Sequence, residues 1–482
     1  MPDATSDTGS DKRQVPDAVC LGCGCLCDDL VVETTATRVV GARNACDKGL
    51  WWLTSDAADR SWIARIRGDA AELNAAIEHG VNMLKGARYP LIYGGADLDC
   101  VAQRRAIAIA DRLRGCVDFC LTDEQRATLR AVQSVGQVTC TLGEIANRSN
   151  MVVYWGADPA TTHPRHGERY ALAPMGEFVP RGRADRTCVV VTDREVATEA
   201  WADEVLRIRS GRHFEAIAVL RALATGAVLE ASEVKRQTGA ELSTWLRLLG
   251  QMKDAQYGAI FYGDQLGAAT APATPASESS SNKYDAGIGR PPHSPACRGE
   301  DVEYCSSHLI VEALLRLVME LNEFARFVSL SLGGGGNSAG AEETMTWTTG
   351  YPYGVSFAQG YPRSFDREHL GEAMLARGEV DAALLVGVNP AELNHAAQRH
   401  LETIPRVLID WRSETAASRA DVAVRIARPG IETGGTAYRA DGVPLPLRPV
   451  RLSAAPAAAS VLEALERSIL ATRETTIASR EA

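Results

Sequence analysis

The sequence predicts an α/β protein in which parallel sheets, covered by helices, form two Rossmann-like lobes. Short apolar segments alternate with helical ones along most of the chain, and one series of strand-like segments occurs twice. A cysteine cluster near the start adds a third element, a small metal-binding domain before the lobes. With 482 residues, the chain can bury a large core in several lobes.

The first strand, loop and helix unit illustrates the alternation. Leu91 to Tyr93 is a short apolar run that ends at Gly94-Gly95. In the following segment, apolar residues recur at helical spacing and share one face: Ala102, Ala106, Ile109 and Leu113. Parallel strands need crossover helices, so the repetition of such units predicts a parallel sheet covered on both faces.

A degenerate internal repeat supports the two lobes. Three features recur in the same order: an apolar strand that stops at Gly-x-Asp/Asn-Pro, a second strand that ends in an acid, and an Ala-Asp step before an Arg-Ile pair. The first copy comprises Met151 to Pro159, Val189 to Arg194 and Ala202 to Ile208. The second comprises Ala383 to Pro390, Val407 to Arg412 and Ala420 to Ile426.

The acids that end the second strands, Asp193 and Asp410, are candidate cofactor-binding residues. Ligands of Rossmann-like lobes bind at the carboxyl ends of strands, where a carboxylate can accept hydrogen bonds from ribose hydroxyls or a guanine edge. For either acid alone, the alternative is that the turn only redirects the chain and the carboxylate only caps a helix. The repeat as a whole favours a two-lobed nucleotide site.

Low-complexity segments set the predicted boundaries. Residues 1–15 are polar and residues 267–300 are dominated by Ala, Ser, Pro and Gly, which predicts a disordered tail and a surface insertion. The other predicted parts are a cluster domain in 16–60, a first lobe from 61–123 and 301–470, a second lobe in 124–266, and a C-terminal tail in 471–482.

The composition argues against several classes of partner. The chain is 45% hydrophobic and 23% charged, with a net charge of −10, as in soluble globular proteins. The sequence has no stripe of Lys and Arg residues that could neutralise the phosphates of a nucleic acid, so we expect no nucleic-acid partner. No apolar run approaches the ~20 residues of a membrane helix, and the N-terminus lacks the apolar region of a signal peptide, so we expect a cytoplasmic protein that binds no membrane.

Five of the twelve cysteines lie between Cys20 and Cys46. Four of them, Cys20, Cys23, Cys27 and Cys46, have the spacing C-x2-C-x3-C-x18-C, which suits a [4Fe-4S] cluster or a structural zinc site. Zinc sites usually have two C-x2-C-like knuckles, whereas the second half here offers only Cys46, which favours iron-sulfur. Buried thiols without a metal are the remaining alternative.

Lys48, which precedes Gly49, is a further candidate. A cation between a cluster and a second cofactor could tune a redox potential or assist electron transfer. The alternative is a solvated surface lysine.

The cysteine pattern with Cys-x-Lys-Gly resembles that of molybdopterin-dependent oxidoreductases. Other stretches narrow the resemblance to the B subunit of formylmethanofuran dehydrogenase: Thr139 to Glu144, Asn147-Arg148, Tyr154 to Gly156, His163 to His166, Gly350 to Tyr353, Gly360 to Arg363 and Gly434 to Arg439. The resemblance extends from Cys20 to about Arg448.

In that family, the resemblance implies, the B subunit carries a [4Fe-4S] cluster and much of a bis-pterin tungsten or molybdenum site that reduces CO2 to formate. An amidohydrolase-type A subunit then joins formate to methanofuran, and the C and D subunits complete the site and scaffold. The implied fold is molybdopterin-oxidoreductase-like, with a small N-terminal Fe-S domain and no C-terminal pterin-binding barrel. The implied pterin is a molybdopterin or tungstopterin guanine dinucleotide.

One position departs from the family. The dehydrogenases have a metal-ligating Cys or selenocysteine followed by a His that handles the formate proton, where this chain has Glu124-Gln125. A thiolate is the soft ligand that suits Mo or W, and Gln cannot act as an acid or base. Cys120 lies four residues earlier, without an accompanying His. We therefore expect the formate-oxidising site to be lost, and we assign no catalytic residue.

His163, Arg165 and His166 follow the first Gly-x-Asp-Pro turn. Paired histidines and an arginine at the carboxyl end of a strand could bind a pterin phosphate. The alternative is a hydrogen-bonded loop.

The loss of Cys-His resembles the bacterial formyltransferase/hydrolase complex, in which the similar subunit is a scaffold. The first hypothesis is thus a non-redox scaffold in tetrahydromethanopterin- and methanofuran-linked one-carbon metabolism. The second is an active tungsten or molybdenum dehydrogenase subunit. The third is a zinc-binding interaction subunit.

Overall fold

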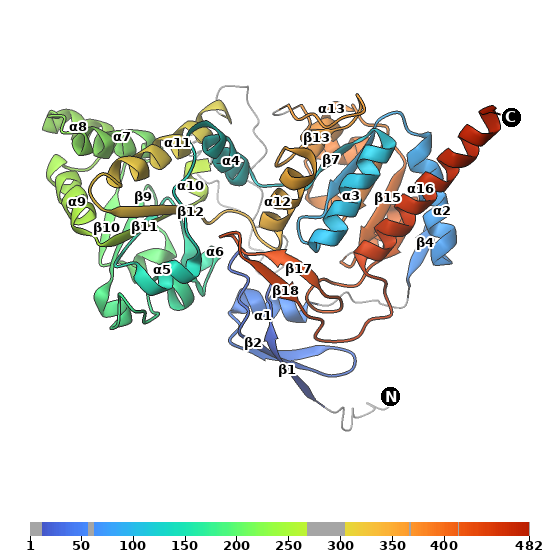
Figure 1. The fold of residues 1–482 in the computed structure, drawn as a ribbon, viewed down its shortest axis with the longest axis horizontal. Helices are drawn as coiled ribbons and strands as arrows, with labels where there is room; N and C mark the ends of the chain where they lie inside the picture. The colour runs from blue at the N-terminus through green and yellow to red at the C-terminus, as the bar shows by residue number, and fades with distance from the viewer. Residues whose placement is uncertain (1–11, 56–61, 268–303, 366–367, 413, 482) are drawn as a thin grey trace, which may run out of the picture. The chain divides into compact units, whose positions relative to one another are not determined.

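The computed structural model describes residues 12–55, 62–267, 304–365, 368–412 and 414–481 (Figure 1). The chain forms two compact units. Unit 1 comprises the residues up to 121, 335–439 and those from 444 onward, and unit 2 comprises 122–334 and 440–443. In the described residues, no helix has both the length and the apolar character needed to cross a membrane.

Unit 1 contains an eight-stranded sheet. Its order is β13 (Val355–Ser356), β7 (Cys116–Asp118), β6 (Pro90–Gly94), β14 (Ala382–Val386), β15 (Arg406–Asp410), β16 (Val422–Arg425), β4 (Ala64–Ile66) and β5 (Asp69–Ala71). The strands from β7 to β16 are parallel, whereas β13, β4 and β5 pair antiparallel at the two edges.

Helices cover both faces of this sheet, because successive strand residues point to opposite faces. Ile92 packs on one face among the helices α2 (Leu73–Gly86), α3 (Cys100–Leu113), α12 (Ser338–Thr349) and α16 (Ala458–Glu481). Its neighbour Leu91 packs on the other face among α13 (Gly371–Arg377), α14 (His395–Leu401) and α15 (Glu414–Arg419).

Unit 2 contains a five-stranded sheet in which every pairing is parallel. Its order is β10 (Glu204–Arg207), β9 (Thr187–Thr192), β8 (Met151–Trp155), β11 (Tyr257–Tyr262) and β12 (Arg326–Ser331). One face is covered by α4 (Asp123–Val135), α7 (His213–Ala224), α8 (Ala231–Thr238), α9 (Leu242–Asp254) and α11 (Tyr304–Leu321).

The cysteine region begins with a small antiparallel sheet of unit 1, β1 (Arg13–Ala18), β2 (Leu30–Thr34) and β3 (Val39–Arg43), followed by α1 (Asp47–Thr54). A hairpin of β17 (Gly435–Tyr438) and β18 (Pro444–Leu447) follows the eight-stranded sheet in the chain.

The internal repeat is confirmed. Its segments form β8, β9 and β10 in unit 2 and β14, β15 and β16 in unit 1, adjacent and in the same order. The turn glycines adopt nearly equal φ values, +57° at Gly156 and +56° at Gly387. Each donates a 2.8 Å hydrogen bond to the second strand, Gly156 N–H to Val191 O and Gly387 N–H to Ile409 O.

Three predicted boundaries are wrong. The first lobe was expected to resume at residue 301, but β12 pairs with β11 in unit 2. The physical reason is that the low-complexity segment interrupts the β11–α11–β12 crossover instead of separating two lobes. Residues 13–15 of the predicted tail belong to β1, and residues 471–481 continue α16. Residues 1–11 and 268–303 lie outside the described residues.

Candidate metal and cofactor site

The cysteine loop folds back on itself between Val19 and Cys27. Cys20 N–H donates to Cys27 O at 2.9 Å, and Leu26 N–H donates to Cys23 O at 3.2 Å. These bonds place the thiols of Cys20, Cys23, Cys25 and Cys27 in the buried interior of the loop.

The fourth predicted ligand, Cys46, is the N-cap of α1, and its thiol accepts a 3.4 Å hydrogen bond from Gly49 N–H. A side chain at Gly49 would put its Cβ 3.1 Å from Cys20 Sγ and 3.7 Å from Cys46 Sγ, so this glycine leaves room for two of the sulfurs. Gly22 N–H donates to Cys20 Sγ at 3.3 Å. Such N–H···S bonds tune iron-sulfur clusters.

The electrostatics of the loop reflect the proximity of all four sulfurs. Burial raises the pKa of Cys20 well above its usual value, and the neighbouring Cys23, Cys27 and Cys46 raise it further. The pKa of Cys23 falls to about 7, first because Cys25 donates hydrogen bonds to it and then because Lys48 attracts the thiolate. The structure thus brings the predicted cysteines and Lys48 together.

Cys25 is a residue that the spacing argument left out. It is buried, it hydrogen-bonds Cys23, and the cation of Arg439 acts on it. Its presence as a fifth cysteine between two predicted ligands was the signal available in the sequence.

The donor set bears on which metal would fit. Among the described residues, no group of three or more His, Cys, Asp and Glu side chains is arranged to hold a metal ion. Four thiolates around one zinc ion would lie about 3.8 Å apart, because each Zn–S bond is ~2.3 Å long. The ligands of a [4Fe-4S] cluster stand farther apart, since iron and sulfide lie between them. The four thiols lie near enough to one another to act on the pKa of Cys20, and clustered thiols are the donor type that both a [4Fe-4S] cluster and a zinc ion require.

Glu124 and Gln125 begin helix α4, whose N-cap is Thr122. Gln125 closes a capping box: Gln125 N–H donates to Thr122 Oγ1 at 3.2 Å, and Thr122 N–H donates to Gln125 Oε1 at 3.1 Å. The Gln125 side chain is buried in this role. It supports the start of the helix.

The Glu124 carboxyl lies at the carboxyl end of the sheet in unit 2. Ser331 Oγ, at the end of β12, donates to Glu124 Oε1 at 3.4 Å, and a Cβ at Gly333 would lie 2.9 Å from Glu124 Cδ. Withdrawal from water raises the pKa of Glu124 to about 8, and the charge of Asp264 adds to the rise. At neutral pH this group is mostly an uncharged acid, which is a poor substitute for a soft thiolate ligand.

Cys120, the alternative ligand, is buried in the core of unit 1. It hydrogen-bonds the phenol of Tyr93, whose pKa burial raises well above the usual value. Cys120 has a φ of +57°, which is rare for a residue other than glycine. In this conformation Cys120 is a packed core residue.

The histidine motif lies in the interior of unit 2. His166 is fully buried, its Nδ1 lies 3.0 Å from Tyr154 Oη, and its ring centroid lies 4.4 Å from that of Phe261. Burial lowers the pKa of His166 to about 3, so the ring is neutral and offers no charge to a phosphate. His166 is thus a neutral hydrogen-bonding group inside the unit, and its role in cofactor binding stays a prediction.

The other two residues of the motif are also buried and engaged locally. His163 Nδ1 lies 2.9 Å from Thr162 Oγ1, and Arg165 pairs with Glu168 at 3.5 Å. All three side chains of the motif therefore make local contacts inside unit 2, and their role toward a phosphate stays a prediction.

The two candidate acids are not equivalent in register. The hydrogen bonds of the repeat align Val191 with Ile409, so Asp410 corresponds to Thr192 and Asp193 lies one residue later. Asp193 accepts a 2.9 Å hydrogen bond from Gly211 N–H and lies 3.6 Å from His213 Nε2.

The adjacent imidazole of His213 and the N–H of Gly211 lower the pKa of Asp193 to about 2, so its carboxylate is charged. Asp410 is buried at the end of β15. Both acids lie at the carboxyl ends of strands, where the repeat predicted them.

Comparison with known proteins identifies relatives along most of the chain, although no protein-family model matches it. It is 32% identical over 440 residues to the B subunit of tungsten-containing formylmethanofuran dehydrogenase 2 of Methanococcus maripaludis, covering 90% of this chain and 93% of the relative. The protein of the same name from Methanocaldococcus jannaschii is 32% identical over 446 residues, or 91% and 94% of the two chains. The B subunit of the Methylorubrum extorquens formyltransferase/hydrolase complex Fhc is 24% identical over 381 residues, or 78% and 88%.

Two solved structures share the fold. The Methylorubrum extorquens formyltransferase/hydrolase complex with methylofuran contains a chain with a TM-score of 0.63 and 21% identity, covering 85% of this chain and 99% of that one. Acetylene hydratase from Pelobacter acetylenicus has a TM-score of 0.60 and 11% identity, covering 94% and 69%. At these identities the likeness shows the fold alone, a mixed α/β fold with parallel sheets.

Proposed function

Because this chain belongs to the family of formylmethanofuran dehydrogenase B subunits, we propose that it is a non-redox scaffold of a formyltransferase/hydrolase-type complex. The complex would act in one-carbon metabolism linked to tetrahydromethanopterin and a methanofuran-like carrier. Its companions would be an amidohydrolase-type A subunit and the C and D subunits.

One observation carries this proposal, the Glu124-Gln125 pair at the start of α4. Gln125 is held in a capping box, and the carboxyl of Glu124 stays mostly protonated at neutral pH. Neither side chain can replace a metal-bound thiolate or the imidazole beside it. The metal-ligating Cys and the proton-handling His of the family are therefore both absent. Because such groups act together, we expect their joint loss to abolish the redox reaction.

The cofactor part of the proposal concerns the cysteines. Cys20, Cys23, Cys27 and Cys46 would hold a [4Fe-4S] cluster, which supplies electron transfer when bound. The peptide N–H groups of Gly22 and Gly49 would stabilise the thiolates, and Lys48 would offset part of their charge. Asp193 and Asp410 are proposed to hold the nucleotide ends of a pterin, if the complex retains one.

A second candidate function is the active tungsten or molybdenum dehydrogenase. The tungsten-containing relatives at 32% identity and the retained cysteine set favour it. The third hypothesis, a zinc-binding interaction subunit, rests on the same four cysteines.

The decisive experiment is an assay of the complex purified without oxygen from cells supplied with tungstate and molybdate. We expect no reduction of viologen dye by formate, together with release of formate from the formylated carrier. Metal and pterin analysis of the same sample shows whether a cofactor is bound but inactive. Tungsten- or molybdenum-dependent formate oxidation would establish the second function instead.

A further inference from the structure

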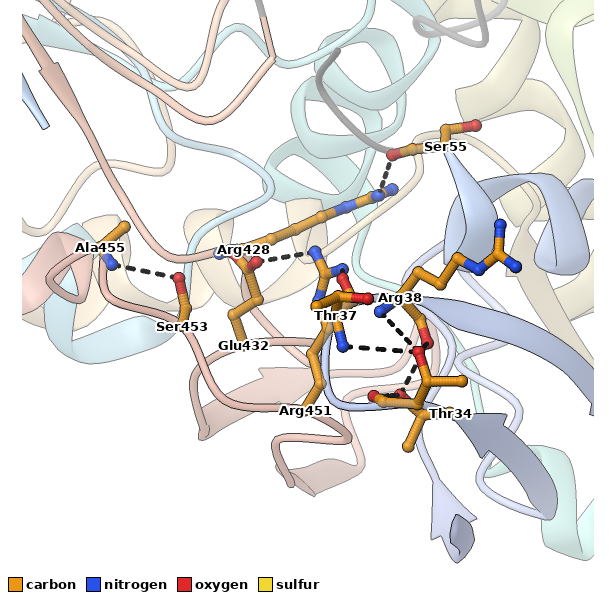
Figure 2. Close-up of polar contacts among 10 residues, drawn as sticks. Thr34, Thr37, Arg38, Ser55, Arg428, Glu432, Arg451, Ser453 and Ala455 are labelled. Atoms are coloured by element: carbon orange, nitrogen blue, oxygen red, sulfur yellow. Dashed lines mark hydrogen bonds and ion pairs between the residues drawn. The ribbon is translucent and has the colours of Figure 1, made fainter. Parts of the chain in front are cut away.

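A segment of unit 1 that is distant in sequence holds the cysteine region in place (Figure 2). Arg451 Nη1 donates to Thr37 O at 2.7 Å, in the turn between β2 and β3. Arg451 also forms a 2.7 Å ion pair with Glu432, and the two side chains are only 2% and 5% exposed. Arg451, paired with Glu432, therefore packs directly against the turn between β2 and β3.

Arg428 contacts the helix that carries Cys46. Its Nη1 donates to Ser55 O at 2.6 Å, and its guanidinium carbon lies 4.9 Å from the centre of the Trp52 ring. Ser55 is the C-cap of α1. Arg428 N–H donates to Glu432 Oε2 at 3.0 Å, so the same carboxylate links both arginines (Figure 2).

This arrangement has a physical consequence for the position of Cys46. A cation at the carboxyl end of a helix is favourable, because it satisfies terminal carbonyls and opposes the helix dipole. Helix α1 spans eight residues, about 12 Å, from its N-cap Cys46 to Ser55, so fixing one end orients the other. Buried ion pairs add little net stability but do select one geometry when all their partners are present.

We propose that Arg428, held by Glu432 and Arg451, is a positioning residue that sets the thiol of Cys46 against those of Cys20, Cys23 and Cys27. Cys46 depends on such support because it is the only one of the four that is partly exposed and the only one outside the loop. An effect of Arg428 on the spectrum or potential of a [4Fe-4S] cluster rests on the proposed function. The effect on the position of the Cys46 thiol rests only on the contacts described above.

The test compares Arg428→Ala with Arg186→Ala in the assembled complex. Arg186 is a matched control: it is buried in unit 2 and donates to four backbone carbonyls there, Ser149 O, Leu172 O, Pro174 O and Ala146 O. Each variant is stripped of iron, reduced and alkylated with iodoacetamide, and the rate at each cysteine is measured by mass spectrometry.

We expect Arg428→Ala to raise the alkylation rate of Cys46 about tenfold relative to that of Cys116, a fully buried core thiol of unit 1, a factor typical of local opening. Arg428→Lys, which keeps the charge but not the planar fork, should recover part of this protection. Arg186→Ala should leave the ratio unchanged. An equal rise at all cysteines, or an equal response in the Arg186 control, would overturn the proposal.

A second measurement separates this inference from the proposed function. With iron present, the electron paramagnetic resonance spectrum of the reduced cluster should change line shape in Arg428→Ala and return toward wild type in Arg428→Lys. If wild type contains no iron, the proposed cluster is wrong, while the alkylation ratio still decides the role of Arg428.

Discussion

The cysteine region and the start of α4 differ in what they retain of a redox site. Around Cys20 and Cys46 the thiols converge, and glycines leave room for the sulfurs. At the start of α4, Gln125 is closed into a capping box and Glu124 is an uncharged acid. Under the proposed function, this difference means that the chain keeps the donor set for one cofactor while the reactive position for another has become part of ordinary helix structure.

The two parallel sheets also differ in which acidic residues they share. Asp203 and Asp421 occupy equivalent places, and each carboxylate accepts from a peptide N–H at the start of the preceding strand, Cys188 at 2.7 Å and Arg406 at 2.9 Å. These repeated acids stabilise strand starts. The acids at the strand ends, Asp193 and Asp410, differ in register and surroundings, so the repeat preserves the framework more faithfully than the chemistry.

The largest expected effect tests the retained half of the comparison. Cys23→Ser should abolish the iron and labile sulfide of the anaerobically purified complex, because it removes one of the four proposed thiolate ligands. Iron and sulfide are measured per complex, with Cys188→Ser as the control. Cys188 is a buried core residue of unit 2. Zinc in place of iron, or iron that survives the substitution, would contradict the assignment.

The sequence predicted the parallel layers well, because strands and crossover helices have strong apolar patterns. Three strands of each sheet follow the repeat in the expected order. The antiparallel edge strands β4, β5 and β13 are only two or three residues long, too short to leave a period in the sequence. The lobe boundary failed because low complexity at residues 267–300 reveals a break in composition, not a break in topology.

The candidate site was predictable where the chemistry is carried by residue type and spacing. Clustered cysteines indicated the thiol site correctly as a place where those residues meet. The burial of His166 against Tyr154 and Phe261 could not be read from a polar motif, because that motif looks the same in a loop or a core. The one-residue offset between Asp193 and Asp410 likewise needs the hydrogen-bond register, which a shared acid at a strand end does not give.

A smaller effect tests whether Gln125 is a helix cap. Gln125→Ala removes the hydrogen bond to Thr122 N–H and should cost ~1 kcal/mol, which lowers the melting temperature by about 2–4 °C for a unit of this size. Gln125→Glu is the matched control, because Glu also completes a capping box. Calorimetry on the complex measures both. If Gln125→Ala leaves stability unchanged but alters cofactor content, the residue belongs to a binding site.

A pH-dependent effect concerns the protonation of Glu124. An unfolded glutamic acid ionises near pH 4.5, whereas the folded pKa is about 8, so the folded state holds a proton that the unfolded state has released between these values. Stability from this group is fully present below pH 4.5 and declines as pH rises toward 8. Glu124→Gln, which mimics the neutral acid, should therefore gain in melting temperature relative to wild type as pH increases from 5 to 9.

Glu233→Gln provides a control of opposite sign. Its exposed carboxylate bonds Arg236, which lowers the pKa of Glu233, so its stabilising contribution is present at neutral pH and is lost as pH falls. The difference in melting temperature between Glu124→Gln and wild type should instead grow as the pH rises and level off above about pH 8. A difference that stays flat across this range would mean that Glu124 is ionised and solvated at neutral pH. The start of α4 would then offer a charged oxygen ligand, and the contrast with the cysteine region would no longer hold.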